Sequence, residues 1–170
     1  MEVAYLALGS NLGDRELFFK KAIRYLRQEG TEVIRCASIY ETEPKDVTDQ
    51  PWFLNTVLEI QTALRPRDLL NLCLSIETEN LRVRSLPKSA RTLDMDILFY
   101  GNHIIHEDGL TVPHPRLAQR NFVLVPLAEI APAFVDPVSG RTIGELMARS
   151  SDTATIRPIA SGQQFLDSSL

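Results

Sequence analysis

The chain has 170 residues, of which 44% are hydrophobic and 24% are charged. This composition suits one domain with a hydrophobic core, is short for two domains, and excludes disorder as the dominant state because disordered chains are poor in large apolar residues. The formal net charge of −4 argues against a general nucleic-acid binder.

The N-terminal part has the pattern of a strand followed by a helix. Val3 to Leu8 is a β-type run, and the Gly9–Asp14 turn ends it. The Asp14 carboxylate can cap the next helix because it can accept the unpaired amide protons of the first turn. The apolar residues that follow are spaced i, i+3, i+4 and i+7, which places on one helical face Phe19, Ala22, Ile23 and Leu26.

Three more strands and a second helix are predicted up to residue 100. The β-branched and aromatic content indicates strands over 33–40, 53–62 and 92–100. Along the second of these, alternation places Leu54, Leu58 and Ile60 on one face and Phe53, Asn55 and Val57 on the other. Pro66 fits the first turn of the second helix, where a missing amide proton costs least.

The order β-α-β-β-α-β over residues 3–100 is that of the ferredoxin-like split βαβ arrangement, an α+β fold with an antiparallel sheet and two helices on one face. The other face stays open for a ligand or for the C-terminal additions, which include a short helix over 143–149. We therefore expect residues 1–150 to form a single domain and the polar, Ser-rich residues 151–170 to form a loosely held tail.

The segment Leu93–Leu98 contains the sharpest chemical signal, because Asp is depleted in strands and two occur here at i, i+2. Asp94 and Asp96 would share one face, and their charges repel unless a cation lies between them. Mg²⁺ commonly takes one or two carboxylates together with phosphate oxygens and water. The alternative is a solvated strand face near a sheet edge.

The basic stretch at 81–92 precedes these aspartates and contains no acidic residue. It carries Arg82, Arg84, Lys88 and Arg91. Carboxylate-held cations beside several guanidinium groups suit phosphoryl transfer, which needs positioning and charge neutralisation. The alternative is a loop that only adds solubility.

Other candidate residues are weaker when taken alone. His114 lies between two prolines, which suits either a rigid phosphate contact or a structural turn. Phe53 and Phe122 could sandwich a flat ring whose edge hydrogen-bonds Asn55, although such residues more often belong to a core. The Gly9–Asp14 turn matches no phosphate-binding motif, and we interpret it as structural.

The chain has two cysteines, far apart and with no metal or redox spacing, so we expect two buried thiols in a reducing cytoplasm. Apolar runs are shorter than the roughly 20 residues that a membrane-spanning helix needs. Glu2 stands where a secretory leader carries basic residues, so no signal peptide is predicted. These features predict a cytoplasmic protein.

Several blocks in one order make the chain resemble the 6-hydroxymethyl-7,8-dihydropterin pyrophosphokinase family over about residues 3–134. The blocks are Ala-Leu-Gly-Ser-Asn-Leu-Gly-Asp at 7–14, Ser38–Tyr40 with Thr42, Gln50-Pro51 with Phe53-Leu54-Asn55, Ile76-Glu77, Arg82-Val83-Arg84, Arg91–Ile97, Leu110–His114 and Pro126–Pro132. The resemblance implies the ferredoxin-like fold, and it implies an ATP-dependent diphosphotransferase of folate biosynthesis that moves pyrophosphate from ATP to the pterin alcohol and releases AMP.

The resemblance also implies a role for each matching residue. Asp94 and Asp96 match carboxylates that bind two Mg²⁺ ions, and Arg82 and Arg91 match the pair that assists the transition state. Positions that hold the triphosphate are matched by Arg82, Arg84, Arg91, His114 and Arg120. Nucleoside contacts are matched by Glu77 and the backbone at Ile97. The pterin site is matched by Thr42, Pro44, Phe53, Asn55 and Phe122.

The sequence departs from the family within the basic stretch. Family members carry Arg-Trp-Gly-Pro-Arg before the aspartates, whereas this chain has Pro87-Lys88-Ser89-Ala90-Arg91. Lys88 stands at the position of the Trp that closes over the substrates, and a lysine can cover phosphate but cannot stack as an indole does.

Two alternative functions stay open at this point. One is a homologue that binds ATP and the pterin but turns over weakly because of the altered loop. The other is a ferredoxin-like RNA-binding module that uses its open sheet face, although the sequence has no RNA-binding aromatic signature. The expected partners are ATP and the pterin, with no nucleic acid or membrane, for a monomer or a homodimer.

Overall fold

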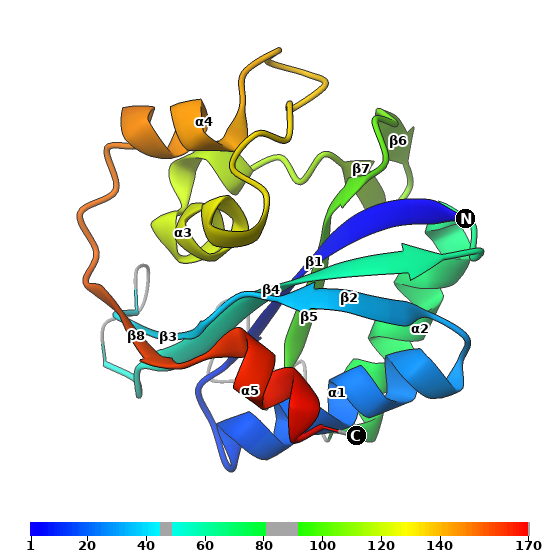
Figure 1. Ribbon diagram of the computed structural model, residues 1–170, viewed down its shortest axis with the longest axis vertical. Helices are drawn as coiled ribbons and strands as arrows, with labels where there is room; N and C mark the ends of the chain where they lie inside the picture. The colour runs from blue at the N-terminus through cyan, green and yellow to red at the C-terminus, as the bar shows by residue number, and fades with distance from the viewer. Residues whose placement is uncertain (45–48, 81–91, 170) are drawn as a thin grey trace.

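The computed structural model describes residues 1–44, 49–80 and 92–169. A six-stranded antiparallel sheet has the strand order β5-β1-β4-β3-β8, and β2 also pairs with β4 (Figure 1). Its strands are β1 (Glu2–Ser10), β2 (Glu32–Cys36), β3 (Ile39–Thr42), β4 (Phe53–Thr62), β5 (Asp94–Tyr100) and β8 (Ile156–Ala160). A separate hairpin pairs β6 (Ile105–Glu107) with β7 (Leu110–Val112).

Helices cover both faces of this sheet. Figure 1 shows α1 (Arg15–Gln28), α2 (Pro66–Glu79) and α5 (Gly162–Asp167) on one face. The opposite face carries α3 (Asn121–Ile130) and α4 (Ile143–Arg149), with a short 3₁₀ helix at Leu117–Gln119 before α3. The order from β1 to β5 confirms the predicted ferredoxin-like α+β fold. Because α3 and α4 cover the second face, that face is not the open surface that an RNA-recognition sheet would present.

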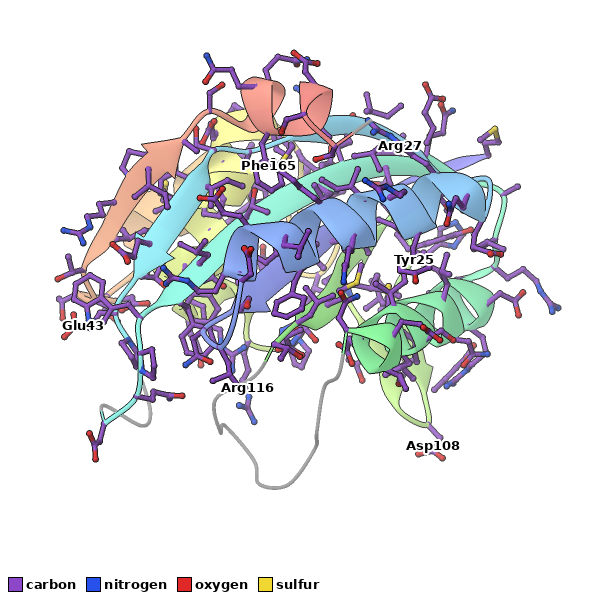
Figure 2. All side chains as sticks on the ribbon, turned by 90° about the horizontal axis from the view of Figure 1, so that it is seen from below. Tyr25, Arg27, Glu43, Asp108, Arg116 and Phe165 are labelled. Atoms are coloured by element: carbon purple, nitrogen blue, oxygen red, sulfur yellow. The ribbon has the colours of Figure 1, made fainter. Side chains whose placement is uncertain are left out.

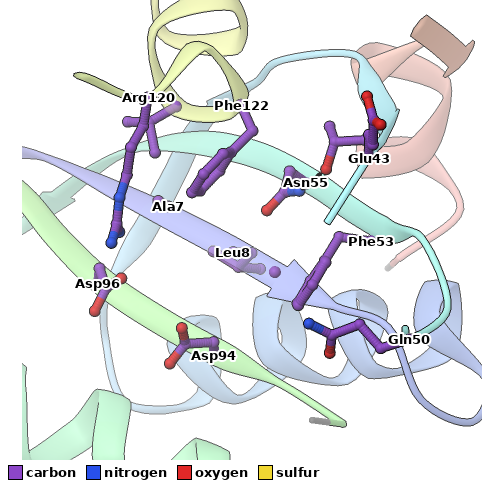
Figure 3. Close-up of a pocket in the computed structure, with 13 residues that line it drawn as sticks. Ala7, Leu8, Glu43, Gln50, Phe53, Asn55, Asp94, Asp96, Arg120 and Phe122 are labelled. Carbon is purple, nitrogen blue, oxygen red and sulfur yellow. Dashed lines mark hydrogen bonds between the residues drawn. The ribbon is translucent and has the colours of Figure 1, made fainter. Parts of the chain in front are cut away.

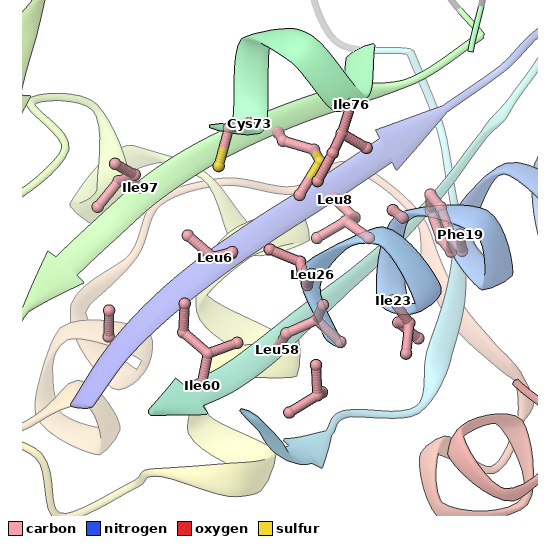
Figure 4. Packing of buried hydrophobic residues seen from close by; sticks show 14 of the residues in the cluster. Leu6, Leu8, Phe19, Ile23, Leu26, Leu58, Ile60, Cys73, Ile76 and Ile97 are labelled. Atoms are coloured by element: carbon pink, nitrogen blue, oxygen red, sulfur yellow. The ribbon is translucent and has the colours of Figure 1, made fainter. Parts of the chain in front are cut away.

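Strand alternation divides the apolar residues into two cores. The α1/α2 side of the sheet holds Leu6, Leu8, Leu58 and Ile60, which pack with Phe19 and Ile23 of α1 (Figure 4). The α3/α4 side holds Tyr5, Val57 and Phe99 together with Leu124 and Leu127. The predicted assignment of β4 residues to two faces is confirmed. The pocket lies at the edge of the core on the α3/α4 side, since Val123 of that core, and Ala7 and Phe122 packed against it, also line the pocket.

The predictions of a helix cap, of a C-terminal helix and of two buried thiols are also confirmed. Asp14 accepts a hydrogen bond from the amide of Leu17 (3.1 Å) and so caps α1. The predicted helix at 143–149 is present as α4, and Thr142 and Glu145 form its capping box. Cys36 and Cys73 are buried, unpaired thiols as predicted. Burial raises the pKa of Cys36 to about 11, and burial also raises the pKa of Cys73.

The predicted strand over 33–40 is interrupted, because the chain forms β2 and β3 with Ala37 and Ser38 between them. The Ser38 amide donates to the carboxylate of Glu129 on α3 (3.0 Å) instead of joining the sheet. Gly162 lies against the same break, where a Cβ atom would stand 2.0 Å from the carbonyl oxygen of Cys36. The interruption therefore makes room for the C-terminal part of the chain.

The C-terminal tail differs from the expectation of a loosely held segment. Residues 156–160 form β8 against β3, and residues 162–167 form α5. Phe165, labelled in Figure 2, and Leu166 are each 5% exposed. The Phe165 ring meets that of Phe19 of α1 edge-on, with ring centroids 6.4 Å apart. A few apolar residues within a polar, Ser-rich stretch are enough to anchor it, which composition alone does not reveal.

Candidate active site

A pocket opens where the ends of β1, β4 and β5 meet the beginning of α3. It is lined from the sheet, from the β3–β4 connection and from α3 by Ala7, Leu8, Gly9, Thr42, Glu43, Gln50, Phe53, Asn55, Asp94, Asp96, Arg120, Phe122 and Val123 (Figure 3). Most of these strand residues share the α3 side because alternate side chains of a strand point to the same face.

Small residues of β1 lie in the middle of the pocket floor, between Asn55 of β4 and the aspartates Asp94 and Asp96 of β5. Gly9 pairs with Asn55 of β4 on one side and with Asp94 of β5 on the other, and Ala7 pairs with Asp96. A Cβ atom on Gly9 would stand 3.0 Å from the Asn55 side-chain oxygen. The run of residues 9–14 predicts only a structural turn for Gly9, so this role of Gly9 was missed from the sequence. The alternation of small residues at 7 and 9 could have indicated it.

Asn55 is held in place by a buried hydrogen bond. Its amide nitrogen donates to the hydroxyl oxygen of Thr42 at 2.6 Å, and both residues are buried. The remaining polar groups of the Asn55 amide face the pocket. Figure 3 shows this side chain between the rings of Phe53 and Phe122. Pro44, predicted alongside Thr42, is buried but does not line the pocket.

The two aromatic rings come from different parts of the fold. Phe53 begins β4, and Phe122 lies in the first turn of α3. Figure 3 shows the rings on either side of the space in front of Asn55. The Arg120 guanidinium lies 5.5 Å from the centre of the Phe122 ring and points down toward Asp96. The arrangement suits a flat, polar-edged ring with a negatively charged group beside it.

Asp94 and Asp96 lie on the same side of β5, as their spacing predicts, and both line the pocket. The residue between them, Met95, points into the core on the other side of the sheet. The amide of Met95 donates to the buried carboxylate of Glu77 on α2 at 2.8 Å. Glu77 therefore fixes the beginning of β5 from behind.

His114 lies close to this pair, with its Nε2 atom 4.0 Å from an Asp96 oxygen. Burial lowers the pKa of His114 to about 4, with further lowering by Arg120 and Arg116 and partial opposition from Asp94. The ring is therefore neutral near pH 7, so this contact is not an ion pair. The amide of Arg116 donates to Nδ1 (3.2 Å), which leaves the ring proton on Nε2, on the side of Asp96.

One further predicted residue, Ile97, lies within the described residues. Ile97 is buried in the core on the α1/α2 side of the sheet. Arg82, Arg84, Lys88 and Arg91 lie outside the described residues.

Magnesium is the only metal that the sequence suggested. Within residues 1–44, 49–80 and 92–169, no three His, Cys, Asp or Glu side chains gather as a metal-binding group. Mg²⁺ often binds through one or two carboxylates and completes its coordination with substrate phosphate and water. The Asp94–Asp96 pair, partly exposed above the small residues of β1, fits that donor set.

The protein thus combines an antiparallel α+β fold with a pocket in which two aromatic rings and an amide lie beside two carboxylates. The chain belongs to the 7,8-dihydro-6-hydroxymethylpterin-pyrophosphokinase (HPPK) family, whose sequence model matches residues 5–132.

Named relatives agree with this assignment. The chain is 47% identical over 129 residues to 2-amino-4-hydroxy-6-hydroxymethyldihydropteridine pyrophosphokinase of Bacillus subtilis, which covers 75% of this chain and 77% of that protein. It is 42% identical over 150 residues to the protein of the same name from Methylorubrum extorquens, with 88% and 94% covered. It is also 40% identical over 158 residues to the folic acid synthesis protein fol1 of Pneumocystis carinii. This chain spans only 21% of that longer protein.

Solved structures support the fold. The Plasmodium falciparum HPPK-DHPS structure with pteroate has a TM-score of 0.70 at 16% identity, covering 87% of this chain and 44% of the other. At that identity the likeness concerns the fold alone. Among the described residues, no helix has the length and apolar content needed to span a bilayer.

Proposed function

We propose that this protein transfers the pyrophosphoryl group of ATP to the hydroxymethyl oxygen of 6-hydroxymethyl-7,8-dihydropterin and releases AMP, a step of folate biosynthesis. The observation that carries the proposal is the placement of an aromatic slot with an amide at its base directly beside two strand-borne aspartates. Family membership and the names of the relatives support the same reaction.

The pterin would lie between Phe53 and Phe122, because a flat heterocycle stacks favourably on aromatic rings. Asn55, fixed by Thr42, would hydrogen-bond its polar edge. The absence of a side chain at Gly9 lets the ring approach the floor, since a Cβ atom there would crowd Asn55. These contacts would leave the hydroxymethyl group on the side of Asp94 and Asp96.

Charged and polar groups would bind the phosphates at the other end of the site. Asp94 and Asp96 would hold Mg²⁺, two ions by the family resemblance, and this metal would neutralise the polyphosphate and orient it. Arg120 and the Nε2 proton of His114 would donate to phosphate oxygens. Arg82, Arg84 and Arg91 stay predicted phosphate contacts, and Arg82 and Arg91 predicted transition-state partners. Glu77 and the Ile97 backbone stay predicted nucleoside contacts.

In the reaction, the pterin hydroxymethyl oxygen forms a bond to the β-phosphorus of ATP. The bond between that phosphorus and the oxygen that bridges to the α-phosphorus breaks, and AMP leaves with the bridging oxygen. The proton of the attacking hydroxyl passes to solvent. The protein contributes mostly by positioning the two substrates and by placing positive charge around the phosphates.

The finer assignments complete the proposal. The protein would act in the cytoplasm as a monomer, with a homodimer as the alternative, and without nucleic acid or membrane as a partner.

The test is direct formation of AMP. The purified chain is mixed with ATP, Mg²⁺ and the pterin, and AMP and pterin diphosphate are followed by chromatography, with Asp96→Ala as the control. We expect equal amounts of the two products from the wild-type protein only. If the wild-type protein makes no more AMP than Asp96→Ala, the proposed function is wrong.

A further inference from the structure

The segment from Ser150 to Ala160, here called the C-terminal brace, lies outside the matched family region of residues 5–132. It leaves the end of α4 and runs back to the sheet as β8, which pairs with β3 (Figure 1). In that pairing Ile156 stands opposite Thr42, the residue that holds Asn55. The brace therefore adds a strand directly beside one side of the pocket.

Near its beginning, the brace holds the first residue of α3. A carboxylate oxygen of Asp152 accepts the backbone amide of Asn121 (2.9 Å), and the backbone oxygen of Asp152 accepts from the Asn121 side chain (2.9 Å). The Arg120 side chain precedes the helix and makes no capping hydrogen bond to it in the described structure, so the Asp152 side chain takes that role from a distant segment. Asn121 separates the pocket residues Arg120 and Phe122.

Further along, the brace holds the opposite wall. The Glu43 amide donates to the carbonyl oxygen of Thr155 (3.0 Å), and the Thr155 amide donates to the Glu43 carboxylate (3.0 Å). Glu43 itself lines the pocket. These reciprocal bonds fix the chain just after Thr42.

Arg157 connects the brace to Trp52, the residue before Phe53. Its Nε atom donates to the Glu41 carboxylate at 2.9 Å, and its guanidinium lies 5.4 Å from the centre of the Trp52 ring. Arg15 reinforces this corner, because it donates to the carbonyl oxygen of Trp52 (2.9 Å) and lies 3.8 Å from Glu41. Trp52 thus packs beneath a cation supplied by the C-terminal part of the chain.

The pocket needs such a connection because its aromatic walls belong to separate elements. Phe122 is carried by α3 and Phe53 by β4, and stacking on both faces of a ring requires a fixed separation between them. The brace contacts the neighbours of both residues within one short stretch, through a hydrogen bond of Asp152 to Asn121 and through the Arg157 guanidinium over the Trp52 ring.

We propose that Asp152 and Arg157 are positioning residues that set the separation of Phe122 and Phe53 and thereby the affinity for the pterin. This inference rests on the proposed function, since it assumes the pterin as the stacked ligand. Neither residue lines the pocket. They act through Asn121 and Trp52, respectively.

The test compares Asp152→Asn and Arg157→Gln with matched controls. Asp152→Asn is isosteric, and its amide faces a backbone donor at one of the two carboxylate oxygens, which accept from Asn121 and Ala154. The controls are Asp167→Asn on α5 and Arg149→Gln at the end of α4, both exposed and away from the pocket. Each full-length protein is assayed for KM of the pterin, KM of ATP, kcat and Tm. The emission of Trp52, the sole tryptophan, is recorded as well.

Loss of one positioning contact should raise the pterin KM about three- to tenfold. The ATP KM should stay within about twofold and Tm should follow the controls, while Arg157→Gln should shift Trp52 emission. A pterin KM within about twofold of the controls would overturn the proposal. So would a parallel rise of both KM values with a fall in Tm, because that pattern indicates a purely structural role.

A second measurement separates this proposal from the proposed function. Calorimetry gives the pterin Kd of the same five proteins, the wild type included, in the presence of Mg²⁺ and a non-cleavable ATP analogue, so it needs no turnover. If the wild-type protein binds the pterin but makes no AMP, the proposed reaction is wrong. The Kd values of the variants then decide whether Asp152 and Arg157 are positioning residues. Failure of the wild type to bind the pterin would overturn both.

Discussion

The floor and the walls of the pocket are built in different ways. The floor consists of Gly9, Asn55, Asp94 and Asp96, which lie on three neighbouring strands and are placed by the hydrogen-bond ladder of the sheet itself. Their relative positions depend on strand register, which two buried cores enforce. The floor therefore carries the groups whose geometry tolerates the least error.

The walls depend on side chains from distant segments. Phe122 follows Asn121, which Asp152 holds, and Phe53 follows Trp52, which packs beneath Arg157. Gln50, on the same side as Phe53, accepts a hydrogen bond from Asn11 at 2.9 Å. Such contacts contribute individually less than a strand ladder and can shift separately. Damage to the floor should therefore cost more activity or affinity than damage to the walls, which should change substrate affinity by smaller degrees.

The largest effect is expected for Asp96→Asn, which keeps the size of the side chain but removes a charge from the proposed metal site. If metal binding contributes several kcal/mol to the transition state, kcat should fall about a thousandfold. AMP formation at saturating substrates measures it. Asp108→Asn, in the exposed turn between β6 and β7, serves as the control. A loss of less than about tenfold in Asp96→Asn would contradict a metal-binding role.

Gly9→Ala tests the floor without touching a charge. The added Cβ atom would stand 3.0 Å from the Asn55 oxygen, so the amide must give way. Overpacking of this kind costs about 1–3 kcal/mol, and the same cost in the pterin complex would correspond to roughly a fivefold to 150-fold loss of pterin affinity. Calorimetry of pterin binding checks it against Gly144→Ala, whose Cβ atom would lie at an ordinary 3.4 Å from the oxygen of Pro132. Equal pterin affinity in the two variants would contradict the prediction, because it would show that the pocket accommodates a Cβ atom at residue 9.

The contrast between floor and walls also explains what the sequence could predict. Asn55, Asp94 and Asp96 were recognisable because a strand places every second residue on one face, so a local pattern contains their common direction. Gly9 was missed because a turn-like run of Gly, Ser and Asn hides its place in the same alternation. The ferredoxin-like order of elements likewise followed from local periodicity.

The supports of the walls left no such pattern. Asp152 and Asn121 are separated by 31 residues, and Arg157 and Glu41 by 116, so only the folded chain brings them together. The tail consequently looked loosely held, although it contains β8 and α5. Phe53 and Phe122 could be named from aromatic character and family resemblance, but their arrangement around Asn55 required the structure.

A smaller effect is expected when one wall is removed. Phe122→Ala takes away one stacking surface, and stacking of a heterocycle on an aromatic ring is worth about 1–3 kcal/mol. The pterin KM should rise about tenfold or more, with a smaller change for ATP because Arg120 loses the ring beneath its guanidinium. Separate KM measurements for the two substrates decide the matter, and an ATP KM that rises more than the pterin KM would count against the proposed stacking.

The smallest effect on activity is expected at the far end of α3, where Glu129 fastens the helix to the interrupted strand. Its carboxylate accepts from the amide of Ser38 (3.0 Å), from the Ser38 hydroxyl (2.9 Å) and from the Tyr40 hydroxyl (2.6 Å). Glu129→Ala removes all three bonds, but from an exposed site, so we expect a loss of only about 1–2 kcal/mol of unfolding free energy.

The same helix thus allows a direct comparison of its two ends. Glu129 lies about two turns beyond Phe122, so its loss should lower Tm by a few degrees while the pterin KM stays within about threefold, since that corresponds to less than 1 kcal/mol of binding free energy. Asp152→Asn should instead raise the pterin KM and leave Tm close to that of its control. Thermal unfolding and pterin kinetics of both variants, measured side by side, test this. A large rise in pterin KM for Glu129→Ala would mean that α3 moves as one rigid body, so that either end controls the wall.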